Sequence, residues 1–356
     1  MKKLLLIDGH SILSRAYYGV PLLSASSGIH TNAVYGFLNI LFKCIDEEKT
    51  DRIAVAFDLE RQKLLRTRLY PAYKGTRKPM PSELLEQVPL IMDLVRAMNI
   101  PILTLEGYEA DDLLGTVAKR SQDAGWEVTI VSGDRDLLQL CDEHIKISMP
   151  KTSKGRTEVF NYYPADVKEQ YQVTPQEFID LKALMGDTSD NIPGLPGVGE
   201  KTATEIIVRF GSIENAREHA EEVRPPRAQK ALQEHYDLAE LSKQLATIDI
   251  HAPAEFDPET SGSGNVNGIK FVKIHTRRTN NLRNNYSFRS VYNKCSAFCH
   301  QRKIPHKYFL LFNFIRFPVA KTDFYFQWSS IRGISGLTFL DIILRILRIH
   351  GIVDKA

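Results

Sequence analysis

The sequence has little cysteine and no long hydrophobic run. Four cysteines in 356 residues are too few for a disulfide framework, which favours a reducing compartment. Cys44 and Cys141 stand in apolar helical patterns, which is typical of small buried thiols. No apolar run reaches the roughly 18 residues of a membrane span. Asp8 ends the first apolar run after four residues, too early for a signal peptide. We therefore expect a cytoplasmic protein without a membrane partner.

Acidic residues are scarce at the end of the chain. From Gly262 to Ala356 there are 16 Lys and Arg against 3 Asp and Glu, whereas residues 1–261 hold 30 against 40. The overall charge of +3 therefore conceals an acidic body and a basic tail. Pro253–Gly264, which is rich in Pro, Ser and Gly, predicts a linker between the two.

Strand and helix patterns alternate in the first half of the chain. Short apolar runs predict five strands buried on both faces, at Lys3–Ile7, Ile53–Phe57, Ile102–Leu105, Val128–Val131 and Ile145–Met149. Helical periodicity separates several of them, at Thr31–Glu48, Ser82–Met98 and Glu109–Ala124. This alternation predicts an α/β fold with a parallel sheet.

The pattern is wholly helical after about residue 160. Helices are expected at Ala165–Tyr171, Pro175–Met185, Lys201–Phe210, Ile213–His219, Pro226–His235 and Leu238–Ala246. We therefore predict an α/β core over 1–165, a helical region over 166–258, and a linker with a basic tail over 259–356.

Nine carboxylates occupy positions where such a fold binds ligands. Asp8, Asp58, Glu109 and Asp134 follow predicted strands, and ligands bind beyond the carboxyl ends of parallel strands. Acids three residues apart share one face of a helical turn. The candidate metal ligands are Asp8, Asp58, Glu109, Asp111, Asp112, Asp134, Asp136, Asp187 and Asp190.

Basic residues are nearly absent from these acidic clusters, where only Arg135 is interleaved. Two carboxylates 4 Å apart repel by about 4 kcal/mol at an effective dielectric constant of 20, so the set requires cations or protons. Oxygen ligands without His or Cys suit Mg²⁺ or Mn²⁺ rather than zinc. Two such ions can activate a water and stabilise the leaving oxygen of a phosphodiester. For any single acid, a helix N-cap is the alternative interpretation.

The segment Arg61–Pro81 contains no acidic residue. Lys and Arg neutralise phosphates and aromatic rings stack on unpaired bases, so a basic segment with tyrosines in an acidic body indicates nucleic-acid binding. A solvated charged face is the alternative interpretation. The basic residues are Arg61, Lys63, Arg66, Arg68, Lys74, Arg77 and Lys78, with Tyr70 and Tyr73 interleaved.

A glycine-rich segment, Gly194–Thr202, lacks the features of both common nucleotide-binding loops. Glu200 stands where a P-loop requires Lys, and no strand precedes the segment as a dinucleotide fingerprint requires. A glycine turn between two helices instead offers backbone N–H groups to an anion, although a simple tight turn is the alternative. The residues expected to contact a DNA backbone are Gly194, Gly197, Val198, Gly199, Lys201 and Thr202.

Taken in order, these motifs resemble the 5′-nuclease (flap endonuclease) domain of bacterial DNA polymerase I. The resemblance runs from Met1 to about residue 258 and rests on Leu6–His10, Ala56–Asp58, Glu109–Asp112, Gly133–Asp136 and Gly186–Asn191. It implies a PIN-like, Rossmann-like nuclease core with a helical arch near residues 61–98, followed by a helix-hairpin-helix region. None of the nine acids is substituted.

The resemblance implies a metal-dependent 5′-3′ exonuclease and flap endonuclease, with two divalent ions, Mg²⁺ or Mn²⁺, held by the nine acids. Its expected substrates are DNA with a 5′ flap or junction and RNA–DNA primer junctions in replication and repair, cut by a monomer. Within this family, Tyr73 would stack near the scissile nucleotide, while Lys74 and Arg77 would stabilise phosphate charge. Arg15 matches a further basic position of the active site.

Three other functions remain open at this point. A catalytically inactive DNA-junction-binding module is disfavoured because all nine acids and Lys74 are present. A phosphohydrolase with an Asp nucleophile requires a second Asp at the position of His10. A PIN-type ribonuclease would lack both the basic segment and the glycine turn.

Residues 262–356 do not resemble the proofreading or polymerase domains that would normally follow. They show no clear strand or helix pattern before Gly336–Ile349, and the spacing of Cys295, Cys299, His300 and His306 is not that of a standard zinc site. The basic charge would add non-specific DNA affinity. Our preferred interpretation is a sequence read out of frame, or fused after a broken polymerase gene.

Overall fold

The computed structural model describes residues 1–25, 28–153, 156–260, 273–277 and 323–327. The chain divides into two compact units, one of Met1–Leu22 with Asn32–Val266 and one of Leu23–Thr31 with Asn267–Ala356. In the second unit, β7 (Lys273–Arg277) pairs antiparallel with β8 (Asp323–Gln327), and the sequence analysis anticipated neither strand. The cysteine and histidine set at 295–306 and the segment Gly336–Ile349 lie outside the described residues.

A six-stranded sheet forms the centre of the first unit, in the order β3-β2-β1-β4-β5-β6. The first five of these strands are parallel, which confirms the predicted α/β fold, and only β6 runs antiparallel, against β5. Ile7 of β1 lies opposite Val55 of β2 and Val131 of β4. The strands are β1 (Lys2–Asp8), β2 (Arg52–Ala56), β3 (Ile102–Leu103), β4 (Trp126–Val131), β5 (Ile145–Ser153) and β6 (Arg156–Tyr162).

Strand β6 was not predicted from the sequence, because an edge strand needs no continuous apolar run. Residues 158–162 of β6 are exposed or half-buried, and Phe160 is among the exposed large hydrophobic residues. Only one side of this strand is hydrogen-bonded within the sheet, so burial does not dictate its composition.

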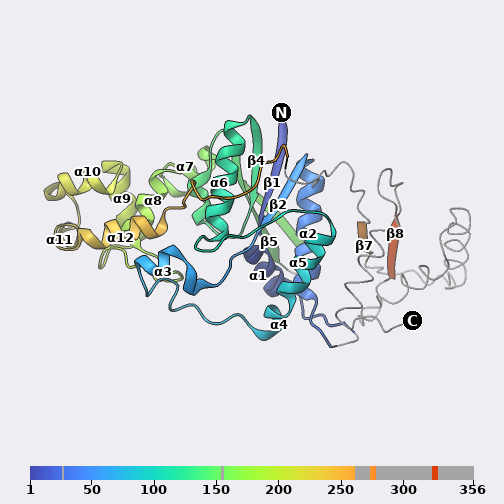
Figure 1. The fold of residues 1–356 in the computed structure, drawn as a ribbon. Coiled ribbons are helices and arrows are strands. Elements are labelled where there is room, and N and C mark those ends of the chain that lie inside the picture. The colour runs from blue at the N-terminus through green and yellow to red at the C-terminus, as the bar shows by residue number, and fades with distance from the viewer. Residues whose placement is uncertain (26–27, 154–155, 261–272, 278–322, 328–356) are drawn as a thin grey trace, which may run out of the picture. The chain divides into compact units, whose positions relative to one another are not determined.

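Helices cover both faces of the sheet (Figure 1). Leu4 and Leu6 of β1 share a core with Leu113 and Leu114 of α6 (Ala110–Asp123). Helices α1 (Gly9–Gly19) and α2 (Asn32–Glu48) lie on the opposite face. The sequence analysis did not anticipate α1, which begins directly after β1 with Asp8 as its N-cap. Cys44 and Cys141 are buried, as expected for structural thiols.

The region of residues 164–246 is helical, as predicted. It contains α7 to α12, joined by turns and one short 3₁₀ helix, Ala220–Glu222. In the described residues no helix is long and apolar enough to cross a membrane. The helices are α7 (Pro164–Tyr171), α8 (Glu177–Met185), α9 (Glu200–Phe210), α10 (Ile213–Glu218), α11 (Pro226–Glu234) and α12 (Tyr236–Ala246).

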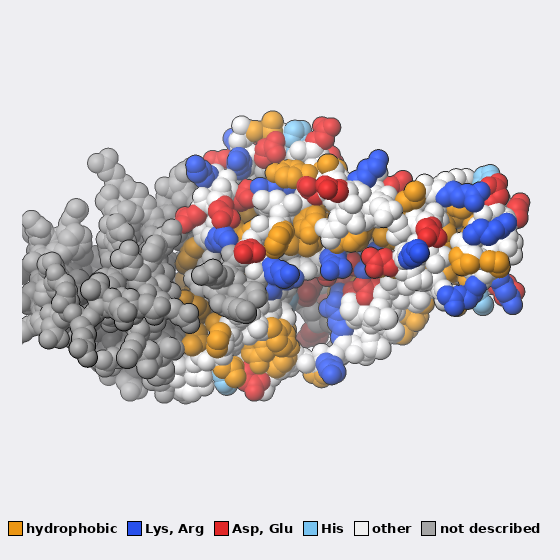
Figure 2. All heavy atoms as spheres, turned by 180° about the vertical axis from the view of Figure 1, so that it is seen from behind, with side chains coloured by type: hydrophobic (Ala, Val, Ile, Leu, Met, Phe, Trp, Pro, Cys, Tyr) orange, Lys and Arg blue, Asp and Glu red, His pale blue; other side chains and the backbone are white. Residues whose placement is uncertain are grey.

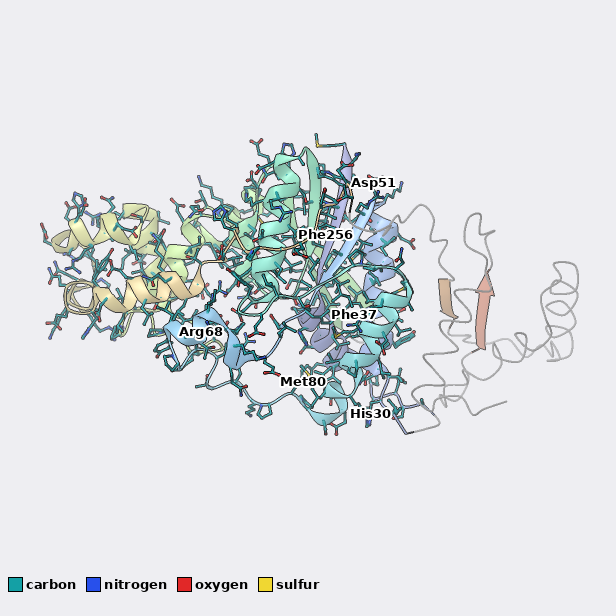
Figure 3. All side chains as sticks on the ribbon, viewed as in Figure 1. His30, Phe37, Asp51, Arg68, Met80 and Phe256 are labelled. Carbon is teal, nitrogen blue, oxygen red and sulfur yellow. The ribbon has the colours of Figure 1, made fainter. Side chains whose placement is uncertain are left out.

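The basic segment is only partly helical. A 3₁₀ turn at Arg61–Lys63 and α3 (Leu65–Leu69) begin it, and α4 (Ser82–Leu85) and α5 (Gln87–Ala97) follow it. Residues 70–81, which carry Tyr73, Lys74 and Arg77, form turns and irregular chain, so the helical arch expected near residues 61–98 is interrupted here. Figure 3 labels Arg68 on α3 and Met80 on this segment.

The predicted linker is in part firmly packed. Phe256 is buried, and Arg120 of α6 donates hydrogen bonds to the carbonyl oxygens of Ala254 (2.7 Å) and Phe256 (2.8 Å). Arg52 donates to the carbonyl oxygen of Pro258, and Lys2 pairs with Glu259 at 2.6 Å. We call residues 247–260 the C-terminal strap, because they run back from α12 along α6 toward β1 (Figure 1).

Candidate active site

Four of the predicted acids meet at the carboxyl edge of the sheet. Asp8 ends β1, Asp58 follows β2 and Asp134 follows β4, and these three strands are parallel neighbours. Asp111 joins them from the first turn of α6. The N-cap interpretation also holds for Asp8, which accepts a hydrogen bond from the backbone N–H of Ser11 at 3.0 Å. Capping and membership of the site are therefore compatible.

Asp8 and Asp111 are acids whose environment disfavours their charge. Burial, followed by repulsion from Asp58 and Asp134, raises the pKa of Asp8 to about 6, although hydrogen bonds from Ser11 and Ser132 oppose this. Burial and the charges of Asp8, Asp134 and Asp58 raise the pKa of Asp111 well above its ordinary value. A cation placed between these side chains would relieve their repulsion.

No Lys or Arg forms an ion pair with Asp8, Asp111 or Asp134 within the described residues. We call these three acids the unpaired set. Asp58 lies beside them, with its carboxylate 3.6 Å from His10 Nδ1 and hydrogen-bonded by the N–H of Ala110 at 2.8 Å. The other five predicted acids, which we call the paired set, are each bonded to a basic side chain: Glu109, Asp112, Asp136, Asp187 and Asp190.

Lys182 of α8 neutralises two acids of the paired set. Its ammonium group lies 2.7 Å from Asp136 Oδ1 and also forms an ion pair with Asp187, and the side chain is only 8% exposed. Burial would lower the pKa of Lys182, but Asp136 and Asp187 raise it. Sequence reasoning missed this residue. The available signal was a lone Lys among the apolar residues of the helix that precedes Gly186-Asp187.

Lys74 and Arg77 of the basic segment bind the other side of the site. Lys74 forms an ion pair with Glu109 and lies 3.7 Å from Asp190, which also binds Arg77. Tyr73 is 3% exposed and donates its hydroxyl to Glu109 Oε2 at 2.9 Å, so its ring is not available for base stacking in this arrangement. These contacts bring Tyr73, Lys74 and Arg77 to Glu109 and Asp190.

The backbone at Lys74 is held in the left-handed region, with φ of 54°. For a residue other than glycine this conformation is strained and is typical of functional sites. The N–H of Lys74 donates to the carbonyl oxygen of Asp190 at 2.7 Å, and Asn191 Nδ2 donates to Ala72 at 2.7 Å. Hydrogen bonds to the backbone of the basic segment therefore hold it against the loop that carries Asp187 and Asp190.

Arg66 and Asp112 form an ion pair with each other, which the sequence did not predict. The guanidinium group of Arg66 is 13% exposed and forms a two-pronged ion pair with the nearly inaccessible carboxylate of Asp112, with both N···O distances 2.7 Å. Asp112 also accepts the N–H of Glu109 and completes the capping box of α6. The other basic candidates in this segment differ: Lys63, Arg68 and Lys78 are exposed, and Arg61 lies in the 3₁₀ turn.

Arg15 reaches the acids from α1. Its Nη2 donates to the carbonyl oxygen of Gly133 at 3.0 Å, one residue before Asp134. A Cβ atom at Gly133 would lie 2.2 Å from Arg15 Nη2, so only glycine allows the guanidinium group this position. The structure thus brings Arg15 to the predicted site.

The glycine turn contains two kinds of residue. Gly194 (φ 61°) is buried, and a Cβ there would lie 2.4 Å from the backbone nitrogen of Gly186, so its role is close packing. Val198 is also buried. In contrast Gly197, Gly199 and Lys201 are exposed and Thr202 is half-buried, and Gly199 is the N-cap of α9 without a side-chain cap. Only this second group is accessible to a DNA backbone.

Further exposed basic residues lie in the region that follows the turn, and they were not selected from the sequence. Figure 2 shows Lys and Arg side chains gathered at its right-hand end, where α10 and α11 lie. Arg227 of α11 contacts the turn directly, through a 2.5 Å hydrogen bond to the carbonyl oxygen of Gly197. The others are Arg209, Arg217, Arg224 and Lys230.

An open groove of about 520 Å³ connects the acids with the glycine turn. Asp134, Asp136 and Asp187 line one part of it, and Gly199 and Glu200 line another. Tyr171 and Phe178, which pack edge to face at 5.1 Å, also line the groove. A chain with a polyanionic backbone can therefore contact the turn and the acids together.

The acids fit a hard divalent cation by their chemistry, although their present side-chain positions do not enclose one. In the described part of the chain, no three Asp, Glu, His or Cys side chains lie close enough to hold a metal ion as they stand. Lys182, Lys74 and Arg77 form ion pairs with acids of the paired set. These ion pairs account in part for the distances between the acidic side chains. The unpaired set offers oxygen donors, the ligands that Mg²⁺ and Mn²⁺ prefer.

Family models match two consecutive parts of the chain. Residues 3–172 match the 5′-3′ exonuclease N-terminal resolvase-like domain, and residues 173–267 match the 5′-3′ exonuclease C-terminal SAM fold. The chain belongs to the 5′-3′ exonuclease family. This confirms the resemblance and the two-part fold that the motifs implied, with a mixed α/β core before a helical region.

Curated relatives are DNA polymerases I. The chain is 47% identical over 254 residues to the enzymes of Bacillus caldotenax and Bacillus subtilis, which covers 71% of this chain but only 29% and 28% of theirs. Among solved structures, T5 5′-exonuclease with bound zinc has a TM-score of 0.59 at 21% identity, over 70% of this chain and 90% of that one. That likeness supports the fold.

Proposed function

We propose that this chain is a metal-dependent, structure-specific 5′-3′ exonuclease and flap endonuclease. The observation that carries the proposal is the unpaired set, three acids at the carboxyl edge of a parallel sheet with no basic partner among the described residues. Family membership supplies the reaction class, and solved structures of similar fold are described with metal ions and with DNA.

Asp8, Asp58, Asp111 and Asp134 would hold a first Mg²⁺ or Mn²⁺ ion, and Asp136 and Asp187 would contribute to a second. Such ions lower the pKa of a bound water and stabilise charge on a phosphodiester. Glu109 and Asp190 hold Lys74 and Arg77 beside these acids. From there, both cations would bind the phosphate being cut, which a negatively charged centre would otherwise repel.

The substrates we propose are DNA with a 5′ flap or junction and RNA–DNA primer junctions, bound by a monomer. The groove supports this, because it joins the acids to the exposed part of the glycine turn. Backbone N–H groups and exposed Lys and Arg bind phosphates without reading sequence, which suits recognition of shape.

Incubation of a 5′-labelled flap duplex with the protein, with and without Mg²⁺, tests the proposal. We expect Mg²⁺-dependent cutting near the junction, and a loss of at least about 10²-fold for Asp111→Asn. The matched control is Asp123→Asn, an exposed acid at the end of the same helix, which should keep wild-type activity.

Three outcomes would contradict the proposal. DNA binding without cutting at any divalent metal would identify an inactive junction-binding module. Cutting of single-stranded RNA alone would identify a PIN-type ribonuclease. Equal activity of Asp111→Asn and the wild type would show that the unpaired set is not the active site.

A further inference from the structure

Every N–H group of the Arg66 guanidinium donates a hydrogen bond to another group of the protein. Nε donates to the carbonyl oxygen of Leu245 at 3.0 Å. Nη1 donates to Glu109 Oε2 (3.0 Å) and Asp112 Oδ2 (2.7 Å), while Nη2 donates to Asp112 Oδ1 (2.7 Å) and the carbonyl oxygen of Thr247 (2.6 Å). Because a guanidinium has five donors, none is left for a DNA phosphate.

Asp112 is equally occupied. Besides the two bonds from Arg66, its Oδ2 accepts the backbone N–H of Glu109 at 3.0 Å and its Oδ1 accepts the backbone N–H of Asp249 at 2.9 Å. A carboxylate offers about four acceptor sites, and four donors fill them here. Asp112 therefore has no free lone pair for a metal ion, although it is next in sequence to Asp111.

Three segments that are far apart in the sequence meet at this ion pair. Arg66 belongs to α3, Asp112 to the first turn of α6, and the two carbonyl oxygens to the end of α12 and the start of the C-terminal strap. The strap continues along α6, where Thr116 Oγ1 donates to Asp249 at 3.1 Å and accepts from the N–H of Ala252 at 3.0 Å. Figure 3 labels Phe256 farther along the strap.

We propose that Arg66 and Asp112 are positioning residues, which fix α3 and the C-terminal strap to the first turn of α6 and so set the place of Asp111. The part that concerns Asp111 rests on the proposed function. In this assignment neither residue touches DNA or metal. An error of about 1 Å in the position of a reacting group is costly, which gives the buried ion pair a function beyond stability.

A double-mutant cycle tests the proposal, with Arg66→Met, Asp112→Leu and the combined variant. Arg68→Met is the control, because Arg68 is exposed on the same helix. Arg66→Met leaves the buried carboxylate of Asp112 without a basic partner, and Asp112→Leu leaves Arg66 paired with Glu109 alone, so we expect the Tm of each single variant to fall by roughly 6–20 °C. Removing both charges together avoids this, so the combined variant should unfold at a higher temperature than either single variant.

Calorimetric measurement of Mn²⁺ affinity on the folded variants distinguishes a displaced Asp111 from a loss of stability. We expect both single variants to lose the same factor, on the order of 10–100-fold, because each releases the same turn of α6. The combined variant should regain stability but not affinity, because the bonds to Leu245 and Thr247 stay lost. Recovery of both properties would reduce the ion pair to a structural role and overturn the proposal. Loss of affinity in Asp112→Leu alone would overturn it in favour of a metal ligand.

Two measurements keep the test independent of nuclease activity. Arg66→Met should leave unchanged the salt dependence of DNA affinity, whereas loss of a phosphate contact would reduce the slope by about 0.9. A reduced slope for Arg66→Met would overturn the proposal. Hydrogen exchange should accelerate by at least about 10-fold in both α3 and residues 247–252 in each single variant, and acceleration in α3 alone would also overturn it. Both readouts stand even if the wild type neither binds Mn²⁺ nor cuts DNA.

Discussion

The unpaired and paired acids differ in what balances their charge. Asp8 and Asp111 are surrounded by other carboxylates, so their charged forms are disfavoured. Asp136 and Asp187 share the ammonium group of the buried Lys182. The first arrangement has no basic side chain to balance it, whereas in the second Lys182 offsets part of the charge, although burial and Asp134 still raise the pKa of Asp136 to about 6. The comparison shows that neighbouring acids can differ in electrostatic environment. Mutations in the two sets are therefore expected to change the free energy of unfolding in opposite directions.

The largest change in the free energy of unfolding is expected when the basic partner of the paired set is removed. Lys182→Met would leave the half-buried Asp136 and Asp187 with no basic partner, at a cost of about 1.5–3 kcal/mol in the free energy of unfolding. Urea denaturation in the presence of EDTA measures it. The exposed Lys168→Met on α7 is the control, with an expected change below about 0.5 kcal/mol. A cost under about 1 kcal/mol for Lys182→Met would remove the distinction between the two sets.

For the unpaired set, we expect removal of a charge to increase the free energy of unfolding of the metal-free protein. Asp111→Asn keeps the shape of the side chain and removes the repulsion, so metal-free protein at pH 7.5 should gain roughly 1–2 kcal/mol in the free energy of unfolding. Asp123→Asn, with its exposed side chain, should stay near zero. Destabilisation of the metal-free protein by Asp111→Asn would contradict the account.

The pH dependence follows from Asp8, whose pKa is raised from 3.8 to about 6. Because the folded state holds its proton more tightly than the unfolded state, this group's stabilisation is complete below pH 3.8 and is lost as the pH rises through 6. Lowering the pH of metal-free protein from 7.5 to 5 should therefore add about 1 kcal/mol from Asp8. Urea denaturation of the wild type and Asp8→Asn isolates this contribution, and parallel pH curves would refute it.

The smallest effect is expected for an exposed basic residue. Lys78→Ala should change the free energy of unfolding by less than about 0.5 kcal/mol. If Lys78 binds a DNA phosphate, the salt-dependence slope of DNA affinity should fall by about 0.9. Binding of a flap duplex at several salt concentrations measures this slope. An unchanged slope would confine the DNA interface to other residues.

Much of the fold was predictable because burial leaves a direct mark on composition. The strand Lys3–Ile7 was recognised by its continuous apolar residues, which a strand buried on both faces requires. The edge strand β6 has no continuous apolar run by which it could be recognised. The linker prediction at Pro253–Gly264 was wrong for residues 253–260, since these pack through backbone carbonyl groups, which any residue type supplies.

The location of the acids was predictable, but the state of each one was not. Strand ends identified the site because parallel strands present their carboxyl ends at one edge. The partner of Asp112 is Arg66, which is 46 residues away, and local sequence contains no trace of such a pair. Lys182 is five residues from Asp187 and was still missed, because a Lys in a helix is ordinarily taken as exposed.

Calorimetric titration with Mn²⁺ at pH 7.5 tests the central claim most directly, which is that the unpaired acids bind the metal. The comparison is between wild type, Asp8→Asn/Asp111→Asn and Asp123→Asn. We predict saturable binding by the wild type and Asp123→Asn, and a loss of at least about 10²-fold in affinity for the double variant. Binding of Mn²⁺ by the double variant with wild-type affinity would contradict the account.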